Sequence, residues 1–270
     1  MIKDPRLRDN PRAEDRDHAV VRALGQRQRF NMDRPEVHTV LRRWRAIADG
    51  YTHAPVLLGE AYVMDVERLA AYYGDGDELH LAFNFLLLHA DLEADALRHV
   101  IANSAALERR DAWPAWAGSN HDAGRLATRW ARGDEDLARC ALMLILLLRG
   151  TPVLYYGDEL ALGAVAIPPA AVLDSGYDAT RTGSRDGSRT PMPWRAGPGA
   201  GFTRPGAHPW LPLGDTARAN VAAQRQDPGS VLHLCRQLLA LRRASEELRS
   251  GDLELLDAPP DVLAWRRGQR

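Results

Sequence analysis

Three short apolar runs, each ending in acids or amides, constrain the fold of this chain more than any other feature. They are Val56–Gly59 before Glu60, Trp116–Ser119 before Asn120-His121-Asp122, and Val153–Gly157 before Asp158-Glu159. Helical patterns separate the runs. Because parallel strands are buried on both faces and keep functional groups at their carboxyl ends, the pattern predicts a parallel α/β fold with its site at those ends.

Composition excludes several other classes of protein. The chain has 270 residues, 45% of them hydrophobic, which suffices for a sizeable core. Lys plus Arg total 35 against 36 for Asp plus Glu, so the net charge of −1 gives no bulk attraction to nucleic acid or a membrane surface. Residues 1–10 lack the apolar centre of a secretory signal, and the apolar run 141–148 is too short to span a bilayer. Cys140 and Cys235 lie in apolar helical patterns, which predicts two buried free thiols and a reducing cytoplasm.

The elements follow from periodicity and caps. Asp33-Arg34-Pro35-Glu36 predicts a helix start capped by Asp33, and Gly50 predicts its end. Further helices are expected over Ala94–Leu107, Glu135–Leu148 and Ser230–Ala244, and a loop over Leu69–Gly76. The predicted strands, expected to be parallel neighbours in one sheet, are Val56–Leu58, Leu81–Asn84, Ala115–Ser119 and Val153–Tyr155.

Two later regions differ in composition from the strand and helix units. Residues 163–227 are rich in Pro, Gly, Arg and Asp and predict a long loop over an active site, because Trp194, Phe202 and Trp210 argue for order despite the polar run from Thr182. Residues 251–270 hold two strand-like pieces, 253–256 and 262–265. These pieces predict one hairpin.

The polar strand ends, followed in order by Arg185-Asp-Gly-Ser-Arg-Thr-Pro-Met-Pro-Trp194, closely resemble the α-amylase superfamily of glycoside hydrolases (family 13), in its α-glucosidase and oligo-1,6-glucosidase branch. The resemblance runs from about Lys3 to Arg267. It implies that residues 1–250 form the C-terminal half of a (β/α)8 TIM barrel and that 251–270 begin a C-terminal β domain. The implied activity is retaining hydrolysis of terminal α-linked glucose from malto- or isomalto-oligosaccharides, without a cofactor or metal.

Retaining cleavage needs a general acid and a carboxylate nucleophile about 5 Å apart. Glu60 resembles the family's acid/base, and partial desolvation at a buried strand end would help it keep a proton; a loop or capping Glu is the alternative. Asp122 resembles the third carboxylate, which orients sugar hydroxyls. His121 would donate to the same sugar ring, with Asn120 beside it.

Further binding residues are implied around the innermost glucose. Arg125 and Arg189 resemble family arginines at this position, since a planar guanidinium can bind a carboxylate and a hydroxyl together; for Arg125 a solvated helix residue is the alternative. Tyr62, Trp194, Phe202 and Trp210 could stack on sugar faces, with core packing equally expected for Trp210. Asp158 and Glu159 receive no catalytic role.

One family motif is missing from the sequence. The family's nucleophile is the Asp of a Gly-Phe-Arg-x-Asp strand end, which precedes a stretch matched here by Lys3-Asp-Pro-Arg-Leu-Arg-Asp-Asn-Pro11. No Gly-Phe-Arg-x-Asp occurs in the 270 residues. The chain alone is therefore expected to be an inactive fragment, whose exposed half-barrel edges favour self-association or aggregation.

Two alternatives stay open. The first is a noncatalytic carbohydrate-binding or transporter-associated relative, although such a protein would need none of Glu60, His121, Asp122 and Arg189. The second is a transglycosidase acting on trehalose or sucrose, which would differ in residues on the leaving-group side. The expected partner in every case is a small oligosaccharide.

Overall fold

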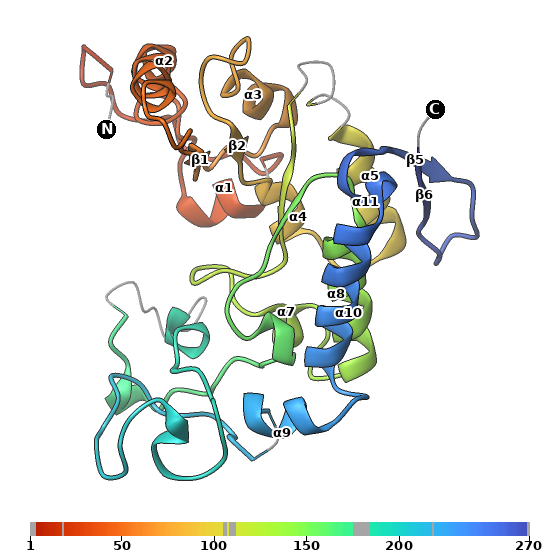
Figure 1. Cartoon of the computed structure of the whole chain (residues 1–270). Helices are drawn as coiled ribbons and strands as arrows, with labels where there is room; N and C mark the ends of the chain where they lie inside the picture. Colours follow the sequence, from red (N-terminus) through yellow and green to blue (C-terminus); the bar gives the residue numbers. More distant parts are fainter. Residues whose placement is uncertain are drawn as a thin grey trace. The chain divides into compact units, whose positions relative to one another are not determined.

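The computed structural model of the chain describes residues 4–17, 19–104, 107, 112–174, 184–217 and 219–268. The chain forms two compact units, traced by colour along the sequence in Figure 1. Unit 1 comprises Met1–Phe83 and Ser104–Pro114, and unit 2 comprises Asn84–Asn103 and Ala115–Arg270.

In its described residues, unit 1 joins two short helices and one of 14 residues, α2, to one pair of parallel strands. Its elements are α1 (Ala19–Leu24), α2 (Glu36–Asp49), β1 (Leu58–Gly59), α3 (Val66–Ala71) and β2 (Leu81–Ala82). The pairing places Leu58 opposite Leu81 and Gly59 opposite Ala82. Gly59 allows this approach, because a Cβ there would lie 2.3 Å from a methyl group of Leu79. The strand that leads to Glu60 is therefore held from one side by β2.

The Lys-Asp-Pro-Arg-Leu-Arg-Asp-Asn-Pro stretch closes the N-terminal segment on itself. Arg8 donates to the buried carboxylate of Asp4 at 2.7 Å, and its guanidinium lies 4.1 Å from the centre of the Phe30 ring. The Asn10 side-chain oxygen accepts from the backbone amides of Arg29 at 3.0 Å and Phe30 at 2.8 Å. The side-chain hydrogen bond from Arg8 holds the pKa of Asp4 well below its usual range. The motif thus fastens residues 4–10 to residues 29–30.

Three sequence-based predictions for unit 1 are wrong. The expected loop Leu69–Gly76 overlaps α3, which begins after the cap Asp65 and buries Leu69 and the two tyrosines that follow it. Asp33 does not cap α2; its backbone φ is +48° and its carboxylate pairs with Arg68. The run before Glu60 is not buried, since Leu58 is 44% exposed. Within the described part of unit 1, β1 has only one strand partner, so its outer edge stays open.

Unit 2 contains most of the described elements. Its α-helices and strands are α4 (Phe85–His89), α5 (Ala94–Asn103), β3 (Ala115–Ala117), α7 (Leu126–Arg129), α8 (Glu135–Leu147), β4 (Thr151–Val153), α9 (Val221–Gln226), α10 (Val231–Ala244), α11 (Glu246–Ser250), β5 (Asp252–Leu256) and β6 (Ala264–Gly268). Four 3-10 helices lie after β4: η1 (Asp158–Leu160), η2 (Pro169–Ala171), η3 (Arg185–Ser188) and η4 (Pro198–Gly201). The predicted long loop is thus broken by short helical turns, and its polar run from Thr182 falls partly outside the described residues.

Helix α8 is the centre of the unit 2 core, as its nearly continuous apolar sequence predicted. It buries Ala138, Ala141, Leu142 and residues 144–146, on more than one side. Trp116 of β3 joins the same cluster and donates from its indole nitrogen to Arg149 O at 2.6 Å. The core therefore fixes the strand that ends near His121 and Asp122.

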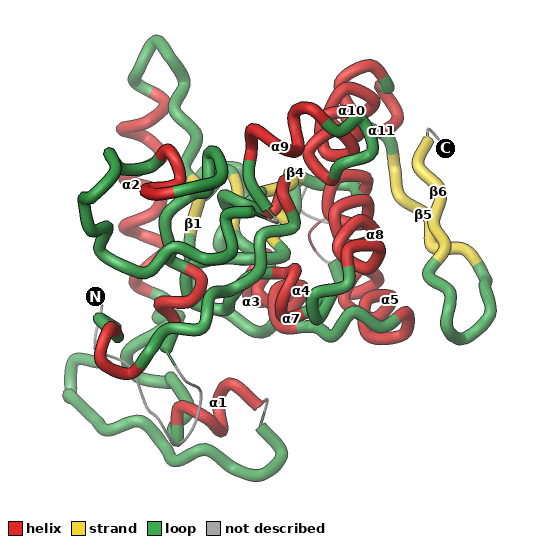
Figure 2. Tube along the Cα trace, turned by 90° about the horizontal axis from the view of Figure 1, so that it is seen from below, coloured by secondary structure: helices red, strands yellow, loops and turns green. Residues whose placement is uncertain are grey.

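Helix α10 packs beside α8 in both views (Figures 1 and 2). Leu146 of α8 meets Cys235 and Leu238 of α10 in one buried cluster. Arg242 donates to Leu146 O at 2.8 Å and Leu148 O at 3.0 Å, which satisfies carbonyl groups at the end of α8. Both cysteines are free, but Cys140 is exposed, so the prediction of two buried thiols holds for Cys235 alone. The apolar pattern of α8 does not distinguish exposed from buried positions, because apolar residues occur on nearly all sides of this helix.

The C-terminal strands β5 and β6 form the predicted hairpin. They pair antiparallel, with Asp252 opposite Gly268 at one end and Leu256 opposite Ala264 at the other. Figure 2 shows the two strands side by side in yellow. Leu253, Leu255 and Trp265 pack on the α8 cluster. The hairpin is therefore part of the unit 2 packing.

The four strands that precede the hairpin pair two by two. β1 is parallel to β2 and β3 is parallel to β4, which confirms the parallel pairing, although β1 and β4 share only Leu58 and Val153 with the predicted ranges. The expected single four-stranded sheet is instead two two-stranded sheets in the described residues. Strand β2 ends early because the Asn84 side chain caps α4, accepting from Leu86 N at 3.1 Å. Across the described ranges, every helix is too short or too polar to cross a membrane.

Candidate active site

The end of β3 projects His121 and Asp122 from a tight loop. All three β3 residues are buried, whereas the side chains of His121 and Asp122 are 51% and 46% exposed. The Asn120 side-chain oxygen accepts from the backbone amides of Asp122 at 2.8 Å and Ala123 at 2.5 Å. Gly124, with φ +92°, closes the turn by a bridge to Asn120. Asn120, a predicted sugar ligand, therefore uses its oxygen to shape the loop.

Two guanidinium groups converge on the Asp122 carboxylate. Arg189 donates to Asp122 Oδ1 at 2.7 Å and to His121 O at 3.0 Å, and Arg185 donates to the same Oδ1 at 3.0 Å. The other carboxylate oxygen, Oδ2, lies 3.6 Å from His121 Nε2. The structure thus brings together three residues that the sequence singled out, His121, Asp122 and Arg189. These three residues and Arg185 together form the Asp122 cluster.

Arg185 was not predicted, and a buried carboxylate explains its position. Asp174 is almost completely buried and accepts from Arg185 at 2.8 Å (Nε) and 2.5 Å (Nη2). The hydrogen bonds that Arg185 donates to the Asp174 carboxylate raise the pKa of Arg185. Asp186, also buried, accepts from the backbone amides of Leu173 and Asp174, which ties the two loop segments together. Arg185 therefore links a buried anchor to an exposed carboxylate.

The base of the β3 loop is held by Ser119 and Asp158. Ser119 donates to Asp158 Oδ1 at 2.7 Å and accepts from Leu126 N at 2.7 Å. Asp158 Oδ2 accepts from Tyr155 N at 3.0 Å. Burial is the main cause that raises the pKa of Asp158 to about 7. The ends of β3 and β4 are therefore joined by one buried carboxyl group. Ser119, which binds this group, lies just before His121 and Asp122 in the sequence.

Arg125 is fully buried, which contradicts the alternative of a solvated helix residue. Its guanidinium lies 4.6 Å from the Tyr156 ring centre and donates to Tyr156 O at 2.5 Å. A Cβ at Gly157 would meet this guanidinium at 2.7 Å, so glycine is required there. Its Nε and Nη2 have no hydrogen-bond partner among the described residues. The contacts with the faces of Tyr155 and Tyr156 stabilise the buried guanidinium of Arg125.

The predicted aromatic residues of the long loop are exposed. Trp210 donates from its indole nitrogen to Arg189 O at 3.1 Å and meets Phe202 edge to face, with ring centres 5.2 Å apart. Core packing, which was the alternative for Trp210, is therefore wrong. Trp210 instead supports the arginine that holds Asp122.

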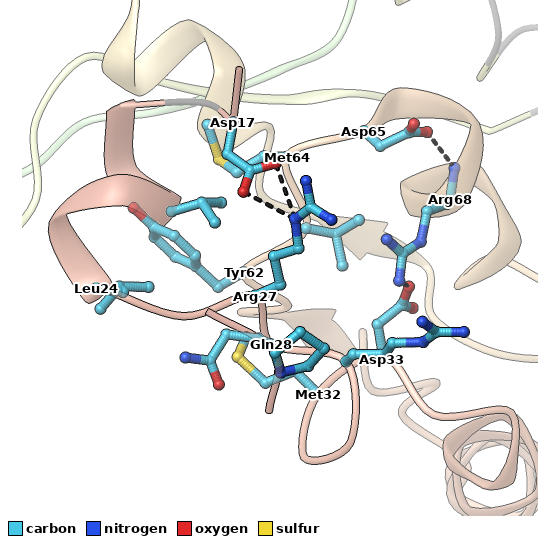
Figure 3. Close-up of a pocket in the computed structure, with 14 residues that line it drawn as sticks. Asp17, Leu24, Arg27, Gln28, Met32, Asp33, Tyr62, Met64, Asp65 and Arg68 are labelled. Carbon is cyan, nitrogen blue, oxygen red and sulfur yellow. Dashed lines mark hydrogen bonds and ion pairs between the residues drawn. The ribbon is translucent and has the colours of Figure 1, made fainter. Parts of the chain in front are cut away.

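Glu60 and Tyr62 both belong to unit 1. Glu60 follows β1 and is exposed, so the expected partial desolvation is absent in this unit. The open edge of β1 accounts for this difference. Tyr62 lines a cavity of about 610 Å³ together with Arg27, Gln28, Met32 and Met64 (Figure 3).

Ion pairs surround this cavity. Figure 3 shows Arg27 reaching the Asp17 carboxylate, with Nε at 2.8 and 3.0 Å from its two oxygens. Asp65 accepts from the backbone of Arg68, whose side chain pairs with Asp33. In the part of the chain that the structure describes, no three His, Cys, Asp or Glu residues are grouped as a metal site would require.

Comparison with known proteins places the fold in a family. The sequence profile of the family described as "Alpha amylase, catalytic domain" matches residues 1–251. The chain therefore belongs to the α-amylase family of glycoside hydrolases. Its α/β units correspond to about half of the (β/α)8 barrel of these enzymes.

Individual relatives agree with this assignment. A probable α-glucosidase of Rhizobium meliloti is 34% identical over 98% of this chain and 50% of the relative. A trehalose-6-phosphate hydrolase of Escherichia coli is 30% identical over 99% of this chain and 52% of the relative. The crystal structure of the α-glucosyl transfer enzyme XgtA superposes with a TM-score of 0.87 at 37% identity, over 99% of this chain and 51% of that one. The chain spans about half the length of the curated relatives it matches.

Proposed function

We propose that this chain carries part of the active site of a retaining α-glucosidase that releases terminal glucose from malto- or isomalto-oligosaccharides. The observation that carries the proposal is the Asp122 cluster, a carboxylate held by two arginines beside a histidine at the end of a buried strand. Similarity to a probable α-glucosidase supports the substrate class.

Asp122 is proposed to bind sugar hydroxyls and to steady positive charge on the glucosyl ring. Its Oδ1 is engaged by Arg185 and Arg189, so Oδ2, on the side of His121, is the oxygen left to accept from a hydroxyl. His121 Nε2 can donate to a neighbouring hydroxyl of the same ring. The two arginines fix the direction of the Asp122 carboxylate, which preorganises the site for a developing cation.

Glu60 is proposed as the general acid and base, from its match to the family motif. In the first step it would protonate the glycosidic oxygen as the bond to the anomeric carbon breaks. In the second step it would take a proton from the water that attacks the glucosyl intermediate. Tyr62, two residues later, extends this region toward the cavity of Figure 3 and is proposed to contact the leaving-group sugar.

The nucleophile is proposed to be the Asp of a Gly-Phe-Arg-x-Asp strand end that the 270 residues do not contain. The matched relatives are about twice as long as this chain, which supports a contribution from further residues. The chain by itself is accordingly proposed to be inactive. The exposed positions of β1 further support self-association of the isolated chain.

Glucosyl transfer is the second candidate function, favoured by the 37% identity to XgtA. It shares the covalent intermediate and differs only in the acceptor that attacks it. A noncatalytic role is less well supported, because the Asp122 cluster would have no task in it. A cytoplasmic site of action is proposed from the two free thiols.

The retaining mechanism is tested by following the anomer of the first product. Proton NMR of an aryl α-glucoside digest by the chain extended to the length of its relatives should show α-glucose before mutarotation, because the aryl leaving group contributes no glucose of its own. β-Glucose as the first product would refute the retaining assignment. With maltose as the donor, every transfer also releases one glucose as the leaving group, so trisaccharide that accumulates with one glucose per trisaccharide would select the transfer candidate instead.

A further inference from the structure

A second cavity on unit 2 shares no residue with the Asp122 cluster. It has a volume of about 500 Å³ and lies among η1, the loop after Met192, α9 and α10. Its lining residues are Glu159, Trp194, Val221, Arg225, Leu232 and Arg236. The function proposed above gives none of them a role in catalysis; only Trp194 was expected from the sequence to stack on a sugar, and it lines this separate cavity instead of contacting the Asp122 cluster through any described hydrogen bond.

The backbone around Trp194 is fixed while its ring is left open. Trp194 N donates to Ala200 O at 2.9 Å, and Trp194 O accepts from Ala222 N at 2.9 Å. The side chain is nevertheless 48% exposed, and its indole nitrogen has no hydrogen-bond partner among the described residues. An exposed indole on a fixed backbone offers a stacking surface that has only two side-chain torsions to restrict when a ligand binds.

The floor of the cavity is apolar. Val221, whose amide donates to Pro193 O at 3.1 Å, is buried, and Leu232 packs against the same small cluster. The cavity thus pairs an aromatic wall with an aliphatic base. That combination suits a ligand with an apolar face.

The rim carries donors and an acceptor that the described residues leave available. Glu159 Oε2 accepts from Gly157 N at 2.7 Å, which holds the carboxylate in place, and no partner for its other oxygen is described. The guanidinium groups of Arg225 on α9 and Arg236 on α10 make no ion pair or side-chain hydrogen bond in the ranges described above. Two planar donors and one acceptor therefore surround the indole.

A neutral polyol can use all three charged groups of the rim, whereas an anion could use the two arginines but not Glu159. An anionic ligand would meet the Glu159 carboxylate at short range, which is unfavourable. A sugar ring can accept hydrogen bonds from both arginines, donate one to Glu159 and place its apolar face on Trp194. We propose that this cavity is a second carbohydrate-binding site, which takes a glucosyl unit of an α-linked oligosaccharide. The choice of glucose as the sugar rests on the function proposed above.

The test is calorimetric titration of the full chain with maltoheptaose. Trp194→Ala should weaken binding by at least about tenfold, because the stacking surface is lost, and Trp194→Phe should restore most of it. Arg236→Gln should also weaken binding. Matched controls are Trp44→Ala, an exposed tryptophan in unit 1, and Arg243→Gln, an exposed arginine on α10; both should bind as the unmodified chain does.

Asp122→Asn separates this proposal from the proposed function. Binding that survives Asp122→Asn and is lost in Trp194→Ala supports the second site whether or not the extended protein hydrolyses maltose. Unchanged binding in Trp194→Ala would overturn the proposal. The proposal would also be overturned if inorganic phosphate bound at Trp194 and displaced maltoheptaose, since the cavity would then be an anion site.

Discussion

Asp158 makes the stability of this protein depend on pH. Its side chain is 1% exposed and joins the ends of β3 and β4 through Ser119 and the Tyr155 amide. Burial raises its pKa from 3.8 to about 7, although Arg125 acts in the opposite direction. Asp158→Asn keeps the shape of the protonated acid and cannot ionise. The amide oxygen can still accept from Tyr155 N, whereas the NH2 group in the place of Oδ1 would donate to Ser119 Oγ instead of accepting from it.

The direction in which stability changes with pH follows from proton binding to Asp158. The folded state holds the proton more tightly than the unfolded state, so this contribution is fully present below the unfolded pKa. It is lost as pH rises through the folded pKa of about 7. The whole shift corresponds to on the order of 4 kcal/mol, and roughly 3 kcal/mol of it falls between about pH 5 and pH 8.5.

The assay is urea unfolding of the original chain and Asp158→Asn at matched protein concentration, followed by circular dichroism at about pH 5 and pH 8.5. The original chain should lose roughly 3 kcal/mol relative to Asp158→Asn between the two conditions. Asp136→Asn on α8 controls for the loss of one exposed charge. A stability difference between the original chain and Asp158→Asn that does not change with pH would refute the reasoning.

Three further predictions concern packing and association. Leu142→Ala should lower the free energy of unfolding by about 2–5 kcal/mol, because Leu142 is fully buried in α8; Leu137→Ala, at an exposed position, is the control in urea unfolding. Arg185→Ala should cost roughly 3 kcal/mol by leaving buried Asp174 without this partner, and a cost near zero would show that Arg189 replaces it. Sedimentation velocity of the isolated chain should show self-association, whereas a monodisperse monomer that melts cooperatively would contradict this.

The long helices could be predicted because their sequences leave few alternatives. An almost continuous apolar run specifies a helix buried on more than one side, as α8 is. The apolar spacing and Ser230 cap of α10 specify both its face and its start. Helix α3 was missed because two tyrosines and a glycine follow it and resemble a surface turn. The Asp65 cap was the signal that could have found it.

Tertiary contacts decided what the sequence left open at the site. His121 and Asp122 were predictable because they follow a buried strand, and Arg189 because its loop matches a family motif. Asp174 was not, because nothing in its local sequence shows that the chain returns to place it under Arg185. The exposure of Glu60 likewise depends on which strands cover β1, and periodicity does not report that.

The central claim is that Glu60 and Asp122 serve a retaining α-glucosidase whose nucleophile lies outside this chain. Glucose release from maltose and from an aryl α-glucoside tests it directly, using the chain as given, the chain extended upstream through a Gly-Phe-Arg-x-Asp strand, and the extended chain with Glu60→Gln. We expect turnover by the extended chain only, because an amide cannot donate and retake the proton. Appreciable turnover by the 270-residue chain alone, or by the Glu60→Gln protein on maltose, would contradict the account.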